Sequence, residues 1–122
     1  MSSRSLDDLR KDVKDMALAH VAACKASGIE LLIYCTLRSN AEQDKLFAMR
    51  PKVTNARAGQ SKHNPDVNGK ATAYDCVPCI SGKPQWANKA LYAQVGALGE
   101  SVGLKWSGRW TGSLKEVAHF EV

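Results

Sequence analysis

The sequence predicts an α+β domain in which helices flank a small antiparallel β-sheet. Its 122 residues and hydrophobic content of 44% are enough for one compact domain with one core, spanning 1–122. The expected elements follow in the order helix, strand, helix, loop, strand, helix, strand. That order lacks the regular strand–helix alternation of a parallel sheet, and neither a repeat nor a linker divides the chain.

The first expected helix begins at the weak capping signal of Ser5 and ends at Gly28. Side chains that could face a core recur along it at helical spacing: Leu6, Leu9, Val13, Met16, His20 and Cys24. The next segment, 29–36, is rich in β-forming residues and predicts a buried strand. Arg38 is therefore expected just past the end of a strand.

A second helix is expected from Ser39, because Ser39 and Glu42 have the spacing of a capping box and Pro51 prevents its continuation. The segment 52–69 is rich in Asn, Gly, Pro and Lys, which predicts an irregular, exposed loop. The remaining elements are a strand, a turn, a helix closed by Gly103 and a final strand, at 71–79, 81–82, 88–102 and 118–122.

The charge of the chain favours acidic partners. It has 17 basic and 12 acidic side chains, and this net charge of +5 suits nucleic acid, anionic lipid or a carboxylate-bearing polymer. The basic residues are scattered and aromatic residues are few, which argues against nucleic acid. The sequence has no apolar run of about 20 residues for a membrane span and no signal-peptide pattern at its N-terminus. We therefore expect a cytoplasmic protein without membrane insertion.

Cysteine spacing argues against a thiol-based metal site. Of the four cysteines, Cys24, Cys35, Cys76 and Cys79, only the last two are close in sequence. A structural zinc ribbon normally presents two such pairs. Reduced and mostly buried cysteines are the favoured interpretation, a cysteine-based metal or redox site is the alternative, and the roles of Cys76 and Cys79 are left open.

The three histidines differ in their surroundings. His20 lies on the apolar stripe of the first helix and is expected to be a hydrogen-bonded core residue. His63 lies in a polar loop, and His119 lies near a probable terminal strand. Asp75, within an apolar segment, requires a cationic partner such as zinc or arginine. Two imidazoles and one carboxylate would leave a fourth position open, as catalytic zinc sites do.

Such a centre also needs a proton acceptor, because zinc lowers the pKa of a bound water from about 15.7 to about 7. Glu116 and Glu121 are both candidates for this base. Glu116 precedes His119 by three residues and can reach the same side of a turn. Glu121 shares a strand face with His119 and could instead bond the outer nitrogen of that histidine. The spacing leaves this choice open.

Five groups of residues stand in a specific order along nearly the whole chain: Thr36-Leu37-Arg38-Ser39 with Glu42-Gln43 and Leu46; Ser61-Lys62-His63; Ala73-Tyr74-Asp75; Gly103-Leu104-Lys105-Trp106 with Trp110; and Glu116-Val117-Ala118-His119-Phe120-Glu121. Together they resemble the M15 family of zinc peptidases. That family includes D-alanyl-D-alanine carboxypeptidases and dipeptidases, and the L-alanyl-D-glutamate endopeptidases of phage endolysins.

The resemblance implies a Hedgehog/D-Ala-D-Ala-peptidase-like fold and assigns roles to six residues. Those that would bind zinc are His63, Asp75 and His119. Glu116 would be the catalytic base. Arg38 would act in catalysis near the scissile carbonyl and, with Ser61, bind the substrate. Trp106 and Trp110 are either cleft walls or packing residues.

One departure from the family pattern concerns the second metal ligand. Asp75 follows His63 by twelve residues, whereas the family commonly places its aspartate sooner. The segment 64–70 therefore resembles an inserted loop, and its Asp66 is a rival ligand. Asp75 is favoured because it alone lies in an apolar strand.

The resemblance implies hydrolysis of peptidoglycan stem peptides by a monomeric zinc peptidase, an L-alanyl-D-glutamate endopeptidase like those of phage endolysins. A D-alanyl-D-alanine carboxypeptidase with the same zinc site is the nearest alternative, and a non-catalytic zinc-binding module is a further one. The enzyme would remain in the cytoplasm until its release to the cell wall or periplasm.

Overall fold

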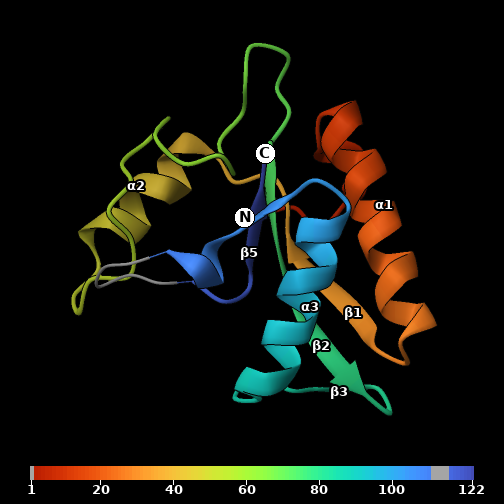
Figure 1. Ribbon diagram of the computed structural model, residues 1–122. Coiled ribbons are helices and arrows are strands. Elements are labelled where there is room, and N and C mark those ends of the chain that lie inside the picture. Colours follow the sequence, from red (N-terminus) through yellow and green to blue (C-terminus); the bar gives the residue numbers. More distant parts are fainter. Residues whose placement is uncertain (1, 111–115) are drawn as a thin grey trace.

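The computed structural model describes residues 2–110 and 116–122 of the chain. Its helices are α1 (Lys11–Ala26), α2 (Asn40–Ala48) and α3 (Lys89–Ser101), with 3-10 turns at Leu6–Asp8 and Ser107–Arg109. Its strands are β1 (Glu30–Cys35), β2 (Ala73–Ile80), β3 (Lys83–Pro84), β4 (Lys105–Trp106) and β5 (His119–Glu121). Helices α1 and α3 lie against the sheet, and α2 stands to one side with the loop that follows it (Figure 1).

The strands of the sheet pair in the order β1-β2-β5-β4, and β3 pairs with β2. Each of these pairs is antiparallel, which confirms the predicted α+β class. Cys35 of β1 stands opposite Asp75 of β2, and Asp75 stands opposite His119 of β5. Because opposed residues of antiparallel strands share a face, this register places three potential metal ligands in one row.

The core lies between the sheet and helices α1 and α3, and it contains a buried histidine. His20 is fully buried, with Nδ1 2.7 Å from the Tyr74 hydroxyl and Nε2 2.9 Å from the Val95 carbonyl. Burial lowers the pKa of His20, so its ring is neutral at pH 7. The prediction of a hydrogen-bonded core histidine is confirmed.

Helix α3 packs closely on the strands through two glycines. A Cβ on Gly96 would lie 2.2 Å from the Trp106 ring, and one on Gly99 would lie 2.5 Å from the Phe120 ring. Trp106 Nε1 in turn donates a hydrogen bond to the Val117 carbonyl at 2.7 Å. The packing of α3 therefore supports the segment that leads into His119.

The first helix begins later than predicted. Ser5 caps only the 3-10 turn, by accepting from the amide of Asp7, and α1 starts at Lys11. The intervening backbone is extended because Arg10 donates to the Ala71 carbonyl and Ala71 donates to the Asp8 carbonyl, both at 2.9 Å. A tertiary contact thus overrides the helical spacing of the sequence.

Most other predicted elements are confirmed, with two changes. Ser39 caps α2 by accepting from the Glu42 amide at 3.1 Å, and α3 ends before Gly103 at a φ of 105°. Strand β1 is an edge strand with Leu32 38% exposed, rather than a buried one. The short strands β3 and β4 were not expected, because two residues carry no periodic signal.

Candidate functional site

Three side chains from separate parts of the chain meet at one end of the sheet. His63 comes from the loop after α2, Asp75 from β2 and His119 from β5. His63 Nε2 lies 3.0 Å from Asp75 Oδ1 and 3.1 Å from His119 Nδ1, and His119 Nδ1 lies 3.1 Å from Asp75 Oδ1. The structure thus brings together the three residues that the sequence predicted as metal ligands.

The outer nitrogen of each histidine ring already has a hydrogen-bond acceptor. His63 Nδ1 lies 2.8 Å from the Thr36 carbonyl, and His119 Nε2 lies 2.8 Å from Glu121 Oε1. With an N–H held at these positions, each ring, once its inner nitrogen has lost its proton, presents the inner lone pair to a metal ion beside Asp75 Oδ1. Metal-binding histidines commonly have such outer partners, which fix the tautomer and the ring orientation.

The spacing and charge of this group suit a small cation. Bonds of about 2.0–2.1 Å in a tetrahedral site would put ligand atoms about 3.3 Å apart, close to the three distances between His63, Asp75 and His119. Burial raises the pKa of Asp75, but hydrogen bonds to both histidines outweigh this effect and lower the pKa. Burial lowers the pKa of His63, yet its contacts with Asp75 and Cys35 raise that pKa to about 10. The site therefore attracts positive charge.

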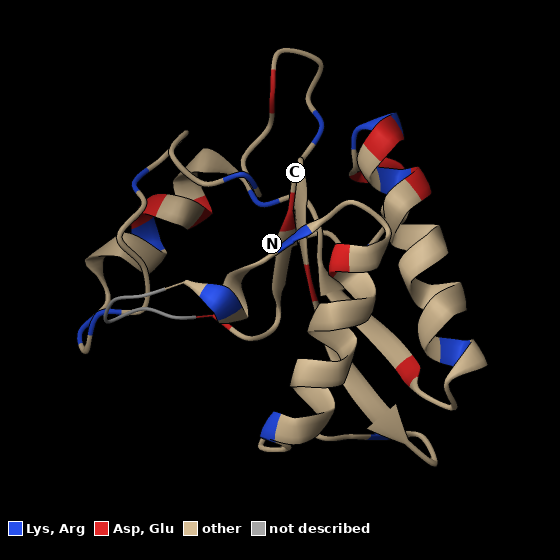
Figure 2. Cartoon of the chain, viewed as in Figure 1, with Lys and Arg blue, Asp and Glu red and all other residues tan. Residues whose placement is uncertain are grey.

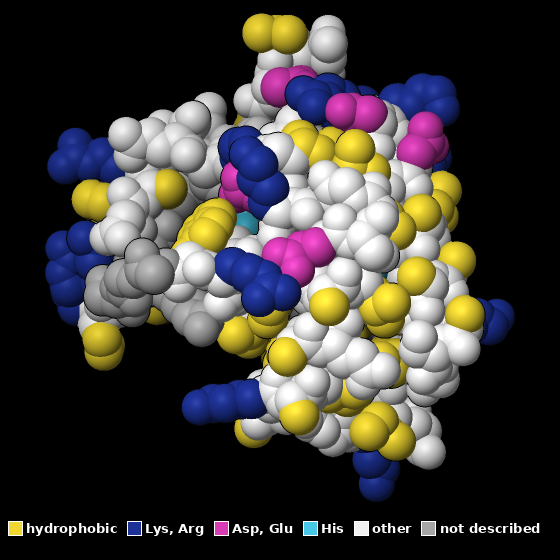
Figure 3. All heavy atoms as spheres, viewed as in Figure 1, with side chains coloured by type: hydrophobic (Ala, Val, Ile, Leu, Met, Phe, Trp, Pro, Cys, Tyr) yellow, Lys and Arg dark blue, Asp and Glu magenta, His cyan; other side chains and the backbone are white. Residues whose placement is uncertain are grey.

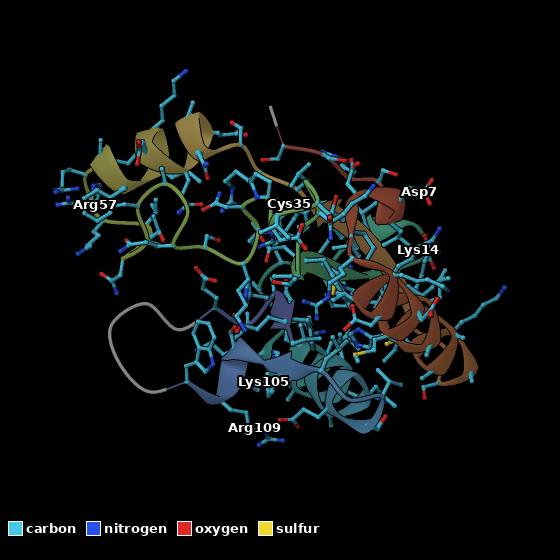
Figure 4. All side chains as sticks on the ribbon, turned by 90° about the horizontal axis from the view of Figure 1, so that it is seen from above. Asp7, Lys14, Cys35, Arg57, Lys105 and Arg109 are labelled. Carbon is cyan, nitrogen blue, oxygen red and sulfur yellow. The ribbon has the colours of Figure 1, made fainter. Side chains whose placement is uncertain are left out.

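Cys35 belongs to the same group and was not predicted to do so. Cys35, His63 and Asp75 form a cluster whose ligand atoms lie within 4.8 Å of one another and could hold a metal ion. However, Cys35 Sγ lies 3.7 Å from His63 Nδ1, the nitrogen that faces the Thr36 carbonyl. The set with His119 uses His63 Nε2, the nitrogen that does not face the Thr36 carbonyl. Figure 4 shows Cys35 near the centre of the molecule.

The remaining cysteines lie away from these atoms. All four cysteines of the chain are free and buried, as the sequence predicted. Cys76 faces the hydrophobic core with Cys24, and Cys79 contacts the Val77 carbonyl.

Arg38 lies beside the carboxylate of the group. Its Nη2 is 4.0 Å from Asp75 Oδ2, and its Nη1 donates to Gln43 Oε1 at 3.0 Å. The Arg38 backbone is tied to the loop that carries His63, because its amide donates to the His63 carbonyl at 2.7 Å and its carbonyl accepts from Asn64 Nδ2 at 3.0 Å. The end of β1 and the loop are thus held as one unit.

The two candidate bases occupy different positions. Glu116 Oε2 lies 3.7 Å from His119 Nδ1, and its side chain is 42% exposed. Burial raises the pKa of Glu116, although the neighbouring His119 lowers it in part. Glu121 contacts the outer nitrogen of His119 with Oε1 and Lys62 Nζ with Oε2, at 2.8 and 3.2 Å. The sequence left two roles open for Glu121, the base or a partner for the outer nitrogen of His119. Its contacts are those of a partner for the outer nitrogen.

A cavity of about 700 Å³ opens above these residues. One wall is formed by Arg38, Leu46 and residues 53–56, and the floor contains His63, Asp75 and His119. Figure 3 shows a histidine in a recess that basic and hydrophobic side chains border. The cavity makes the atoms of the candidate metal ligands reachable from solvent.

Three further residues predicted for the site have distinct environments. Ser61 lines the cavity, and its Oγ accepts from the His63 amide at 3.1 Å. Trp110 also lines it, is 43% exposed and lies 5.7 Å from the His119 ring. Trp106 is buried in the core. Of the two roles that the sequence allowed, Trp110 is therefore a cleft wall and Trp106 is a packing residue.

The loop between His63 and Asp75 protrudes from the domain, as predicted for an insertion (Figure 1). Its base closes where the Thr72 amide donates to the Lys62 carbonyl at 2.9 Å. Asp66 Oδ1 accepts from the Asn68 and Lys70 amides, at 2.8 and 3.0 Å, and does not line the cavity. Asp66 is thus occupied in shaping the loop and is not part of the group formed by His63, Asp75 and His119.

Solved structures share this fold. The L-Ala D-Glu endopeptidase ChiX of Serratia marcescens matches with a TM-score of 0.76 and 22% identity, over 100% of this chain and 88% of ChiX. The LD-carboxypeptidase LdcB, whose structure describes peptidoglycan recognition, matches with a TM-score of 0.64 and 17% identity, over 99% of this chain and 72% of LdcB. The fold is that of these two peptidases. No model of a protein family matches the chain.

Within the described residues, no helix is both long and apolar enough to cross a membrane.

Proposed function

We propose that this protein is a zinc-dependent peptidase that hydrolyses the stem peptides of peptidoglycan. The observation that carries the proposal is the group of His63, Asp75 and His119, with both outer ring nitrogens bonded, at the floor of a cavity. The fold shared with ChiX and LdcB supports the substrate class. The activity proposed first is that of an L-alanyl-D-glutamate endopeptidase of the phage endolysin type.

Each residue of the site has a task in this chemistry. His63, Asp75 and His119 would hold zinc, which when bound supplies Lewis-acid chemistry and promotes ionisation of water. Glu116 accepts the proton of the attacking water at a carboxylate oxygen and returns it to the leaving amine. Arg38 stabilises the negative charge that develops on the scissile carbonyl oxygen.

Glu116 suits the role of the base better than Glu121. Its carboxylate faces the cavity, and its raised pKa makes it a stronger proton acceptor. Burial raises the pKa of Glu121, but its hydrogen bonds with His119 and Lys62 outweigh this and lower it. Both carboxylate oxygens of Glu121 are thereby engaged, so it orients His119 and is unsuited to transferring protons.

The distribution of charge suits a polymer that bears carboxylates. The segment 38–62, which supplies one wall of the cavity, contains six basic and two acidic residues: Arg38, Lys45, Arg50, Lys52, Arg57 and Lys62, and Glu42 and Asp44. Figure 2 shows basic residues on α2 and the following loop. Of these basic residues, Arg38 and Lys62 line the cavity itself, and the excess of positive charge on the segment would attract the free carboxylates of stem peptides. We propose that a monomer acts there after release from the cytoplasm to the wall.

A carboxypeptidase with the same site is the second candidate. The fold shared with the LD-carboxypeptidase LdcB supports it, and a terminal carboxylate could bind Arg38 or Lys62 of the cavity lining. A D-alanyl-D-alanine carboxypeptidase is the form that the resemblance to the M15 family implies.

Digestion of purified peptidoglycan, followed by mass spectrometry of the products, tests the function. New termini at L-alanyl-D-glutamate bonds are expected from the wild-type protein with one zinc bound, and no products from a His119→Ala control. Release of a single C-terminal D-amino acid would instead establish the carboxypeptidase. Intact peptidoglycan after incubation with zinc-loaded wild-type protein would refute both.

A further inference from the structure

Gln43 is a fully buried polar residue that the proposed chemistry does not use. It lies in α2, and both ends of its side-chain amide are bonded. Nε2 donates to the Ala56 carbonyl at 2.8 Å, and Oε1 accepts from Arg38 Nη1 at 3.0 Å. One side chain therefore connects the arginine of the site to residues 53–56 of the cavity wall.

Few other contacts restrain the Arg38 guanidinium. Nη2 lies 3.5 Å from Cys35 Sγ, a weak acceptor, and 4.0 Å from Asp75 Oδ2, beyond hydrogen-bond distance. Nε is buried and has no hydrogen-bond partner within the part of the chain that the structure describes. Among those residues, Gln43 thus supplies the only oxygen to which the guanidinium donates a hydrogen bond.

The neighbouring carboxylate is a strong competitor for this guanidinium. Arginine and carboxylate groups form short, often bidentate pairs, and a small movement of Arg38 would close the 4.0 Å gap to Asp75. Such a pair would withdraw negative charge from a residue of the metal group. It would also remove the guanidinium from the cavity.

We propose that Gln43 is a positioning residue that holds Arg38 away from Asp75. The carboxylate then remains available to a metal ion and the guanidinium remains available to the substrate. The second half of this statement rests on the proposed function, whereas the first concerns metal binding alone.

Asp44 provides a matched control, because it bonds the loop just beyond residues 53–56 and forms no hydrogen bond or ion pair with Arg38 in the part of the chain that the structure describes. Its Oδ1 accepts from the Ala58 amide at 2.8 Å, and its side chain is exposed. Loss of Asp44 therefore loosens the loop but leaves the contact between Gln43 and Arg38 intact.

The test is a double-mutant cycle of Gln43→Met and Arg38→Met, with zinc affinity measured by competition against a chromophoric chelator. Gln43→Met should weaken zinc binding by about 10-fold, as loss of a supporting contact does. Adding Arg38→Met should restore the affinity to near that of the wild type, because the guanidinium that captures Asp75 is gone. Asp44→Ala should leave the affinity unchanged. Melting temperatures check that each variant is folded.

A Gln43→Glu variant separates the two bonds of Gln43. It keeps an acceptor for Arg38 and loses the donor to Ala56, so near-normal zinc affinity is expected. Equal weakening by Gln43→Met with and without Arg38, or equal weakening by Asp44→Ala, would overturn the proposal. Peptidoglycan cleavage is measured in parallel: wild-type protein that binds zinc and obeys the cycle but cleaves nothing would refute the proposed function and leave the positioning role standing.

Discussion

The orientation of the two site histidines is decided by what their outer nitrogens contact. The Thr36 carbonyl can only accept, so His63 must carry its proton on Nδ1, and Glu121 imposes the corresponding tautomer on His119. Rotation of either ring would break a buried hydrogen bond. The inner nitrogens are therefore fixed toward Asp75 before any ligand arrives.

The role of Glu116 can be tested without disturbing the metal group. Glu116→Gln keeps the size of the side chain but cannot accept a proton, so activity on purified peptidoglycan should fall by about 100-fold to 10,000-fold. Zinc content and melting temperature should stay near those of the wild type, because Glu116 is not among the three closely spaced residues. Activity restored by added zinc would instead identify Glu116 as a metal-supporting residue.

Glu121→Gln should produce the opposite pattern. The variant weakens the acceptor at the outer nitrogen of His119, so zinc affinity should fall by about 10-fold to 100-fold. Cleavage measured over a range of free zinc should largely recover at high concentration. A variant that is fully loaded with zinc and inactive would show that Glu121, rather than Glu116, is the base.

At this scale, the sequence was informative where a residue is unusual for its surroundings. Asp75 in an apolar strand and the short spacing between Glu116 and His119 pointed to the residues that the structure groups together. Cys35 gave no such signal, and Gln43 stood in one of the motifs without a role assigned to it, because a cysteine at a strand end and a glutamine in a helix are ordinary. Their contacts depend on strand register and on the position of α2, which one sequence does not specify.

Among the elements, helix α3 packs closely because two of its residues are glycines. Gly96→Ala would raise helix propensity by about 1 kcal/mol, yet its Cβ would lie 2.2 Å from the Trp106 ring. The clash should dominate and lower the free energy of unfolding by about 1–3 kcal/mol, measured by urea denaturation. Ala97→Gly, on the exposed side of the same helix, is the control: it should lose about 1 kcal/mol through propensity alone. A stabilised Gly96→Ala variant would contradict this packing.

Element prediction succeeded where local chemistry decides the structure. The capping box at Ser39 and the glycine after α3 each fix a helix end through nearby atoms. The predicted start of α1 and the predicted burial of β1 were wrong for a common reason. The start of α1 depends on hydrogen bonds with Ala71, and the edge position of β1 depends on its pairing with β2 alone. Both partners lie far away in the sequence.

For the whole molecule, removal of the metal should lower the free energy of unfolding. A ligand that binds only the folded state at 1,000 times its dissociation constant adds about 4 kcal/mol to the free energy of unfolding. Chelation should therefore lower the melting temperature, and His119→Ala should melt like the metal-free protein. His20→Ala should keep its zinc and lose only core packing, because His20 contacts Tyr74 and Val95. Equal melting of metal-free and zinc-loaded protein would contradict a buried metal site.

The pH dependence of the metal-free protein has a defined sign. The folded pKa of His63 is raised from 6.5 to about 10, so its protonation adds stability that is complete below pH 6.5. That stability is lost as the pH rises from 6.5 toward about 10. Zinc requires the neutral ring, so binding near pH 7 should release protons, which calorimetry in buffers of different ionisation enthalpy measures. Binding without proton release would show that His63 is neutral in the metal-free protein.

The protruding loop between His63 and Asp75 is a site where the domain can accept inserted sequence. Its base is pinned by the bond from Thr72 to Lys62, and Val67 at its tip is fully exposed. Chain inserted at Val67 would extend outward from a closed base, and loop length adds little entropic cost once the ends are fixed. A peptide, an affinity tag or a second binding domain can therefore be inserted in this loop. The insertion would lie between His63 and Asp75 in the sequence without altering the distance between them.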